Sequence, residues 1–268
     1  MTNTAPWRRW LAEFLGTALL VTAVVGSGVM ATTLSPDNIG LQLLENSAAT
    51  AFALAALILM FGPVSGAHFN PVVSFADWYL GRRSSRDDTG LSGRNLPGYV
   101  IAQVVGAVAG SILANVMFAL PAVEFSTKAR AAGHLWLGEV VATSGLVFLV
   151  FALARSGRAA VAPAAVGAYI GAAYWFTSST SFANPAVTIG RAFTDTFAGI
   201  APSSLPGFIG AQLVGLLLGV GLLVVLYPDA GRAADDVVVP HPADTDTAEP
   251  PHRLTSPTIG YREGSVDE

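Results

Sequence analysis

Two short segments combine asparagine, proline and small or apolar residues without any Asp, Glu, Lys or Arg. They read S-G-A-H-F-N-P-V-V at 65–73 and T-S-F-A-N-P-A-V-T at 180–188, and their asparagines, Asn70 and Asn184, are 114 positions apart. Asparagine is a favoured N-cap residue, and proline is favoured at the first helical position, where its missing N–H costs nothing. Each segment therefore predicts a loop that starts a short helix, with a hydrogen-bonding carboxamide at the junction.

Two carboxylates stand inside otherwise apolar stretches of the chain. Glu13 lies in L-A-E-F-L-G at 11–16, and Glu139 lies in L-G-E-V-V-A at 137–142. An ionisable group in such a stretch is expensive and is by default functional. A proton relay and a structural role for these two side chains are both open at this point.

The remaining polar residues do not form a catalytic or metal-binding set. The chain has no cysteine, and its isolated histidines are not at ligand spacing from acids (His134, His241 and His252). Neither a nucleophile elbow nor a phosphate-binding loop occurs. We therefore expect a protein that is not an enzyme, with no cofactor, no metal site and no nucleic-acid partner.

The composition defines what these residues are embedded in. Of 268 residues only 32 are charged, which is 12%, whereas 52% are hydrophobic. Twelve of the 32 charges lie in residues 229–268, so the first 228 residues carry only 20. A soluble domain could not cover its surface with so few charges. This excludes a cytosolic enzyme, a nucleic-acid binder with a basic face and a disordered acidic protein, and it indicates an integral membrane protein.

Charge-poor intervals predict the number of membrane crossings. A helix needs about 20 largely apolar residues to cross the hydrocarbon core. This rule predicts six crossings, at about 10–33, 44–62, 97–119, 135–154, 159–177 and 205–227. The charge-free intervals 46–76 and 159–190 are too long for one crossing, and each ends in an Asn-Pro segment. Those segments are expected to be loops and half-helices at membrane depth, where irregular backbone must be buried or line a water-filled cavity.

The two halves of the chain repeat. P-G-Y-V-I-A-Q-V-V-G at 97–106 matches P-G-F-I-G-A-Q-L-V-G at 206–215. Each half, about 10–120 and 135–227, thus contains three spans and one broken helix, and an odd number of spans makes the two halves inverted across the membrane. We expect one all-α channel domain over 10–227.

Basic residues predict the orientation. With the amino terminus inside, three basic residues remain outside (Lys128, Arg130 and Arg191), and eleven lie inside: Arg8, Arg9, Arg82, Arg83, Arg86, Arg94, Arg155, Arg158, Arg232, Arg253 and Arg262. This bias predicts a multi-pass protein of the plasma (inner) membrane with both termini cytoplasmic, residues 1–9 included. The acidic tail, 228–268, has too little apolar surface to fold and is expected to be disordered.

Paired Asn-Pro boxes in an inverted three-plus-three repeat resemble the major intrinsic proteins, the aquaporins and aquaglyceroporins. The resemblance covers 10–227 and is closest to members encoded with bacterial arsenic-resistance genes. It implies six transmembrane helices, two re-entrant half-helices and a homotetramer with one pore per subunit. It also implies that the two boxes meet at the pore midplane, where the asparagines donate hydrogen bonds to neutral solutes; the box residues are Asn70, Pro71, Val72, Asn184, Pro185 and Ala186.

The resemblance also assigns a selectivity constriction. Most members have an arginine where this chain has Val187, and the other positions fall at Thr50, Ala172 and Ser181. Gly171, Ala172 and Ala173 are all small, so a slip of one residue leaves the set unchanged. This set predicts a wide, neutral constriction. For Arg191, one turn beyond Val187, a cap on the half-helix and a displaced gate in the outer vestibule are both open.

The resemblance bears on three further sets of residues. It implies that Glu13 and Glu139 hold the backbone of the adjoining re-entrant loops, and that His68 faces the inner vestibule. Tyr174, Trp175 and Phe176 are expected to pack at the outer membrane interface rather than stack on a solute. Glycines at four-residue spacing are expected to permit close helix contacts, as at 106 and 110 and at 215 and 219.

These observations favour a passive channel for small uncharged solutes, with the lipid bilayer as its surroundings. The expected solutes are glycerol-like polyols, metalloid acids such as arsenite, and water. The alternative is a proton-coupled secondary transporter that uses Glu13 and Glu139, and a third class is a membrane scaffold without an open lumen. The sequence does not select the physiological solute or a gating mechanism.

Overall fold

A computed structural model describes residues 5–83 and 90–227. The tail 228–268, expected to be disordered, lies outside the described residues, as do residues 1–4 and Arg86. Six helices are long and apolar enough to cross a membrane, and each matches one of the six predicted spans. They are α1 (Pro6–Leu34), α2 (Ile39–Ser65), α4 (Leu96–Met117), α5 (Gly133–Arg155), α6 (Ala162–Phe176, preceded by a 3-10 turn at Ala159–Val161) and α8 (Leu205–Leu226, preceded by a 3-10 turn at Pro202–Ser204).

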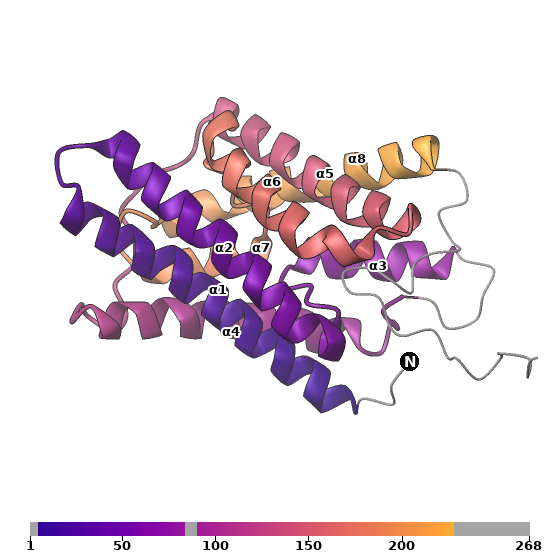
Figure 1. Cartoon of the computed structure of the whole chain (residues 1–268). Helices are drawn as coiled ribbons and strands as arrows, with labels where there is room; N and C mark the ends of the chain where they lie inside the picture. Colours follow the sequence, from indigo (N-terminus) through magenta and orange to yellow (C-terminus); the bar gives the residue numbers. More distant parts are fainter. Residues whose placement is uncertain (1–4, 84–89, 228–268) are drawn as a thin grey trace, which may run out of the picture.

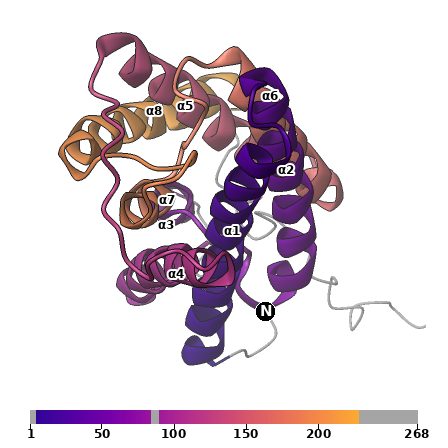
Figure 2. The ribbon, with the colours of Figure 1, turned by 90° about the vertical axis from the view of Figure 1, so that its left-hand side faces the viewer.

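Two shorter helices begin at the Asn-Pro boxes. They are α3 (Pro71–Arg82) and α7 (Pro185–Gly190), and a 3-10 turn (Arg191–Phe193) continues α7. In Figure 1 the two start near the middle of the bundle and run in opposite directions, α3 toward the right and α7 toward the left. Seen end-on in Figure 2, they project onto the same place, with the long helices around them. The half-helices therefore lie end to end inside the bundle and meet by their amino ends, as predicted.

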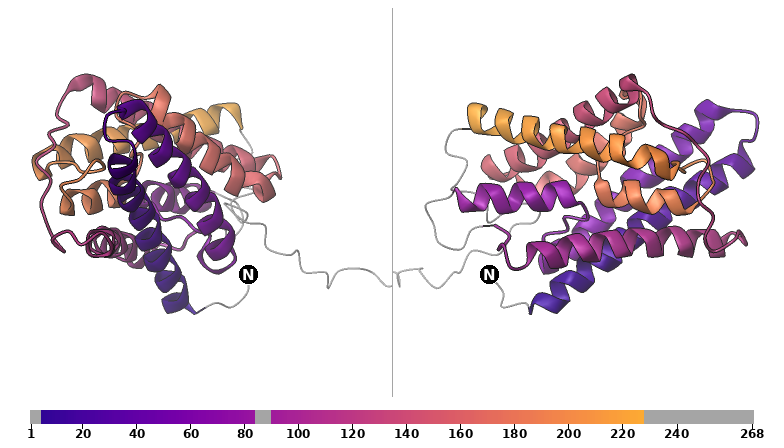
Figure 3. Two further views of the ribbon diagram at one scale, coloured as in Figure 1. Left: turned by 60° about the vertical axis from the view of Figure 1, so that its left-hand side comes forward. Right: turned by 180° about the vertical axis from the view of Figure 1, so that it is seen from behind.

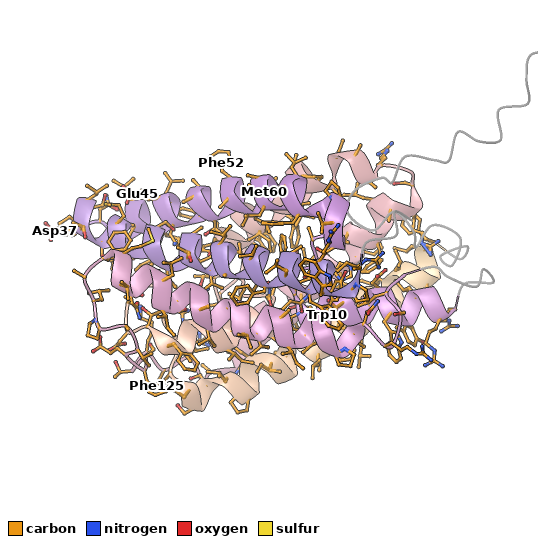
Figure 4. All side chains as sticks on the ribbon, turned by 90° about the horizontal axis from the view of Figure 1, so that it is seen from below. Trp10, Asp37, Glu45, Phe52, Met60 and Phe125 are labelled. Carbon is orange, nitrogen blue, oxygen red and sulfur yellow. The ribbon has the colours of Figure 1, made fainter. Side chains whose placement is uncertain are left out.

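The bundle has two distinct ends. The helix α1 begins and α8 ends at the same end, which we call the terminal end, and the loop at 35–38 marks the opposite or far end (Figures 1 and 3). In Figure 4, Asp37 and Glu45 mark the far end, whereas Trp10 lies toward the terminal end. Phe52 and Met60 project outward from α2 and are 77% and 61% exposed, as expected of side chains that face lipid.

Glycines set the distance between the paired long helices. A Cβ atom on Gly215 would lie 2.8 Å from the carbonyl oxygen of Val140, and one on Gly219 would lie 2.7 Å from that of Ser144. In the other half, Cβ atoms on Gly106 and Gly110 would overlap the carbonyl oxygens of α1. The predicted close helix contacts are thus confirmed for both pairs, α1 with α4 and α5 with α8.

Candidate functional site

The two asparagines cap the half-helices. The Oδ1 atom of Asn70 accepts a hydrogen bond from the Val72 N–H at 3.1 Å. Likewise, the Oδ1 atom of Asn184 accepts from the Ala186 and Val187 N–H groups at 3.0 and 3.2 Å. Pro71 and Pro185 occupy the first helical positions, where no N–H is needed. Each box thus starts its helix with the local chemistry that the sequence predicts.

The same two asparagines also join the half-helices to each other. The Nδ2 atom of Asn70 donates to the carbonyl oxygen of Ala183 at 2.8 Å, and that of Asn184 donates to the carbonyl oxygen of Phe69 at 2.7 Å. A carboxamide nitrogen has two hydrogens, and each bond uses one. Both asparagines line the cavity described next, so each retains one donor for a molecule inside it.

A cavity of about 70 Å³ runs past the junction. Four long helices contribute apolar side chains at four-residue spacing, which places them on one helix face. These are Leu20 and Val24 of α1, Leu54 and Ile58 of α2, Leu146 and Val150 of α5, and Val166 and Ile170 of α6. The polar part of the lining comes from the two Asn-Pro loops, from α2 and α6, and from the end of α7; its residues are His68, Asn70, Ser181, Asn184, Thr50, Tyr174 and Arg191. The cavity therefore combines apolar side chains with hydrogen-bonding ones.

Two loops of unusual backbone carry part of this polar lining. Gly66, Ala67 and Phe69 have φ of +85°, +50° and +49°, and the residues 114 positions later, Thr180, Ser181 and Ala183, have φ of +61°, +50° and +48°. The left-handed region is uncommon for residues other than glycine and is unfavourable for a β-branched one. Such a backbone persists only where its surroundings hold it.

Glu13 and Glu139 hold these loops. Glu13 accepts from the His68 and Phe69 N–H groups at 3.0 and 2.7 Å. Glu139 accepts from the Phe182 and Ala183 N–H groups at 2.9 and 2.8 Å. Both carboxylates are completely buried, and neither lines the cavity. This is the geometry expected for backbone support, and it places neither group where a solute would pass.

Two glutamines complete the support. The Nε2 atom of Gln103 donates to Glu13 at 2.8 Å and to the Ser74 hydroxyl at 2.9 Å. The Nε2 atom of Gln212 donates to Glu139 at 2.6 Å and to the Thr188 hydroxyl at 2.8 Å. These glutamines belong to the repeated A-Q-x-V-G segments. Their hydroxyl partners, Ser74 and Thr188, were not singled out in the sequence, although these two residues are also 114 positions apart.

Three of the four residues expected at the constriction line this cavity. Thr50, Ser181 and Val187 line the cavity, whereas Ala172 does not, because its side chain is exposed on the outside of α6. The lumen-facing residue is Tyr174, whose hydroxyl lies 3.3 Å from the Thr50 hydroxyl. The placement of Ala172, and of Tyr174 at the outer interface, was therefore wrong. Trp175 and Phe176 are about half exposed, as expected at an interface.

Arg191 lines the same cavity, which also includes His68 and so extends beyond the expected constriction; the neutral character of that constriction stays a prediction. Its Nε atom donates to the carbonyl oxygen of Ala198 at 2.5 Å, and its Cζ atom lies 3.5 Å from the centre of the Phe182 ring. The side chain is 2% exposed. Its hydrogen bond to residue 198 shows that the guanidinium does not cap its own half-helix, which was one of the two open readings.

His68 lines the cavity on the side of the terminal end. Its Nδ1 atom lies 3.0 Å from the Ser74 hydroxyl, and its Nε2 atom lies 3.6 Å from Oδ2 of Asp77. Asp77 was absent from the predicted site. The 114-residue spacing between the two repeats could have identified Asp77. Asp77 and Arg191 are 114 positions apart and therefore occupy matching positions of the two half-helices.

Comparison with known proteins identifies the family. The profile of the family described as major intrinsic protein matches residues 1–183. The chain is 51% identical over 216 residues to "Aquaglyceroporin AqpS" of Rhizobium meliloti (strain 1021), covering 81% of this chain and 88% of that protein. The chain belongs to the major intrinsic protein family. It is therefore a multi-pass membrane channel protein and not an enzyme.

Other relatives of this major intrinsic protein are more distant. The chain is 31% identical over 283 residues to "Glycerol uptake facilitator protein" of Pseudomonas aeruginosa, with 88% of this chain and 97% of that protein covered. Among solved structures, the aquaglyceroporin from Plasmodium falciparum superposes with a TM-score of 0.61 at 20% identity, over 84% of this chain and 99% of that one. This superposition confirms the predicted fold. A link to arsenic resistance stays a prediction.

The described part of this major intrinsic protein contains no group of three His, Cys, Asp or Glu side chains that could hold a metal ion. The polar groups around its cavity are instead single hydrogen-bonding side chains spread along the lumen.

Proposed function

We propose that this chain is a passive channel for small uncharged solutes, namely glycerol-like polyols, water and metalloid acids such as arsenous acid. The observation that carries the proposal is the junction itself, where two carboxamides with one spare donor each share a cavity with apolar side chains of four long helices. A polyol has the same two-sided character, because its hydroxyl oxygens accept hydrogen bonds and its carbon chain prefers an apolar surface. The names of the two relatives, an aquaglyceroporin and a glycerol uptake facilitator, support this solute class.

The half-helices supply the ion barrier. Their amino ends meet at Asn70 and Asn184, and a helix amino end is equivalent to roughly half a positive charge. A cation at the junction would face both ends without a compensating carboxylate in the lining. A neutral solute avoids this repulsion and still receives the amide hydrogen bonds.

The constriction would act as a second selection point. The Ser181 hydroxyl is buried and has no hydrogen-bond partner among the described residues, and Tyr174 and Thr50 line the same cavity. Arg191 adds guanidinium N–H donors there. We infer that Thr50, Ser181, Val187 and Tyr174 shape this point and that a solute's oxygens are received there before they reach the asparagines.

The proton-coupled alternative is less well supported. Such a transporter would need Glu13 or Glu139 to meet the solute or a proton path, yet both carboxylates accept backbone N–H groups outside the cavity lining. We infer that they are supports for the two loops. A channel then gives downhill flux that does not depend on a proton gradient.

We further propose the cellular arrangement. The terminal end is cytoplasmic, because seven described arginines lie toward it: Arg8, Arg9, Arg82, Arg83, Arg94, Arg155 and Arg158. Residues 10–227 form the channel unit in the plasma (inner) membrane, and 228–268 form a cytoplasmic tail. By analogy with the family, four copies assemble into a homotetramer with one pore per subunit.

Stopped-flow light scattering of proteoliposomes tests the function. We expect rapid downhill influx of water, glycerol and arsenous acid that is the same with and without an imposed proton gradient. Asn184→Asp should lower glycerol flux and raise cation leak, because it replaces the donor with a carboxylate. Asn38→Asp is the matched control, since Asn38 also caps a helix through its Oδ1 atom (2.9 Å from the Leu41 nitrogen) but lies exposed at the far end. Flux that requires a proton gradient, or equal effects of both variants, would refute the proposal.

A further inference from the structure

The channel opens at the far end into a second, larger cavity, which we call the outer vestibule. It has a volume of about 210 Å³ and shares Arg191 and Tyr174 with the lining of the channel. Lys128 and Arg130 also line it, together with Asn46 and Thr180. The side chains of three cationic residues thus contribute to its lining, and no aspartate or glutamate of the described residues does.

One backbone segment holds the three cations in place. Three successive carbonyl oxygens each accept a hydrogen bond from one of them: Phe197 from Lys128 Nζ at 2.9 Å, Ala198 from Arg191 Nε at 2.5 Å and Gly199 from Arg130 Nε at 3.2 Å. Because neighbouring peptide groups are only a few ångströms apart, the three positive charges are held close together. Like charges in such an arrangement repel one another unless an anion lies between them.

The guanidinium of Arg191 is the most deeply buried of the three cationic groups. Its Nε bond to Ala198 is its only side-chain hydrogen bond among the described residues, which leaves both Nη groups with donors to spare. Phe182 covers one face of the guanidinium. The charge of Glu139 also acts on Arg191, but that carboxylate already accepts hydrogen bonds from three N–H donors. A buried charge without a hydrogen-bonded partner is costly.

Lys128 and Arg130 are also surrounded by more positive than negative charge. Burial and the charges of Arg130 and Arg191 lower the pKa of Lys128 from its ordinary value, and burial lowers the pKa of Arg130. Asp195 acts in the opposite sense on Lys128, but its carboxylate already accepts the N–H and hydroxyl groups of Thr127 and is exposed. The vestibule thus lacks a negative charge of its own.

We propose that the outer vestibule binds a small oxyanion between Lys128, Arg130 and Arg191, and that an oxyanion bound there inhibits the flux of neutral solutes. Guanidinium groups bind carboxylate and phosphate-like oxygens through paired, charge-assisted hydrogen bonds. Tyr174 and Arg191 belong to both cavities, so an anion on Arg191 lies in the path of a solute leaving or reaching the constriction. The inhibition rests on the proposed channel function, whereas the binding does not.

Inorganic phosphate is the probe, because it is an oxyanion that does not cross the bilayer. Glycerol flux into proteoliposomes of the full chain is measured with external phosphate at increasing concentration, and chloride keeps the ionic strength constant. We expect a saturable loss of glycerol flux. Lys128→Gln and Arg130→Gln should each raise the phosphate concentration for half inhibition about ten-fold, because each removes one charged donor. Arg158→Gln, the same charge change at the terminal end, should leave it unchanged.

Titration calorimetry of the detergent-solubilised protein with phosphate separates binding from flux. Binding heat that disappears in Lys128→Gln and persists in Arg158→Gln supports the vestibule site, even if no variant conducts glycerol and the proposed function fails. If Lys128→Gln does not fold, Arg130→Gln provides the same comparison. The inference is overturned if phosphate neither binds nor inhibits, or if Arg158→Gln weakens its action as much as the vestibule variants do.

Discussion

Replacing Glu139 with glutamine removes the support of the second loop with a change of only one atom. The carboxylate accepts from the Phe182 N–H through one oxygen, and from the Ala183 N–H and Gln212 Nε2 through the other. A glutamine has only one acceptor oxygen. At best this oxygen keeps the bonds from the Ala183 N–H and Gln212 Nε2, and the amide NH2 then points at the Phe182 N–H, which is itself a donor. The best orientation therefore leaves the Phe182 N–H buried without a partner.

The magnitude follows from these three bonds. A buried donor without a partner costs about 1–3 kcal/mol. The two bonds that survive lose their charge assistance, which makes a hydrogen bond roughly twice as strong as a neutral one. Glu139→Gln should therefore lower the free energy of unfolding by about 2–4 kcal/mol. For a chain of this size, that corresponds to a fall in Tm of about 5–15 °C.

Thermal unfolding in mild detergent, followed by tryptophan fluorescence, measures this change. Glu13→Gln is the companion variant, since Glu13 holds the first loop in the same way, and it should be destabilised by a similar amount. Glu45→Gln is the control, because Glu45 accepts only the Ser35 hydroxyl, at 2.8 Å, and a hydroxyl can reverse its role. A Tm for Glu139→Gln equal to that of Glu45→Gln would refute the support role. A stable Glu139→Gln protein without flux would favour the proton relay instead.

Three further substitutions, two of them with a matched control, test the packing and the lining. Gly219→Val should destabilise the protein by about 2–4 kcal/mol through overpacking, whereas Gly221→Ala, with open space around it, should not; Tm values compare them. Tyr174→Ala should raise glycerol flux relative to water flux, and Ala172→Phe should change neither, because its side chain faces outward. Val187→Arg adds a second guanidinium to the lining, so stopped-flow traces should show glycerol flux falling more than water flux.

Much of the fold is predictable because the membrane simplifies the rules. A span must be long and nearly free of charge, so the charge-poor intervals locate all six crossing helices. The half-helices are predictable for a local reason, since an asparagine cap and a following proline define a helix start without any tertiary contact. The resemblance to the major intrinsic proteins also implied that Glu13 and Glu139 support the loop backbones, and the contacts of both carboxylates have that geometry.

The rotation of a helix about its axis is harder to predict from sequence. In α6 the lumen-facing stripe is Val166, Ile170 and Tyr174, and Ala172 lies about 200° from Ile170 on a helix with 3.6 residues per turn. Nearly every residue of this helix is apolar or small, so its composition does not distinguish the two faces. Arg191 presents a related difficulty, because its direction is set by the carbonyl oxygen of Ala198 in a loop with no regular pattern.

The two mouths of the channel differ because some side chains depart from the inverted repeat. An offset of 114 relates Asn70 to Asn184 with matching bonds, but the same offset relates His68 to Phe182 and Asp77 to Arg191. At the terminal end, the carboxylate of Asp77 accepts the Leu91 N–H at 2.8 Å and lies near His68. At the far end, Arg191 faces the lumen beside an aromatic ring. The repeat thus supplies the same backbone twice, and the residues that break its symmetry place the buried guanidinium of Arg191 at the far end.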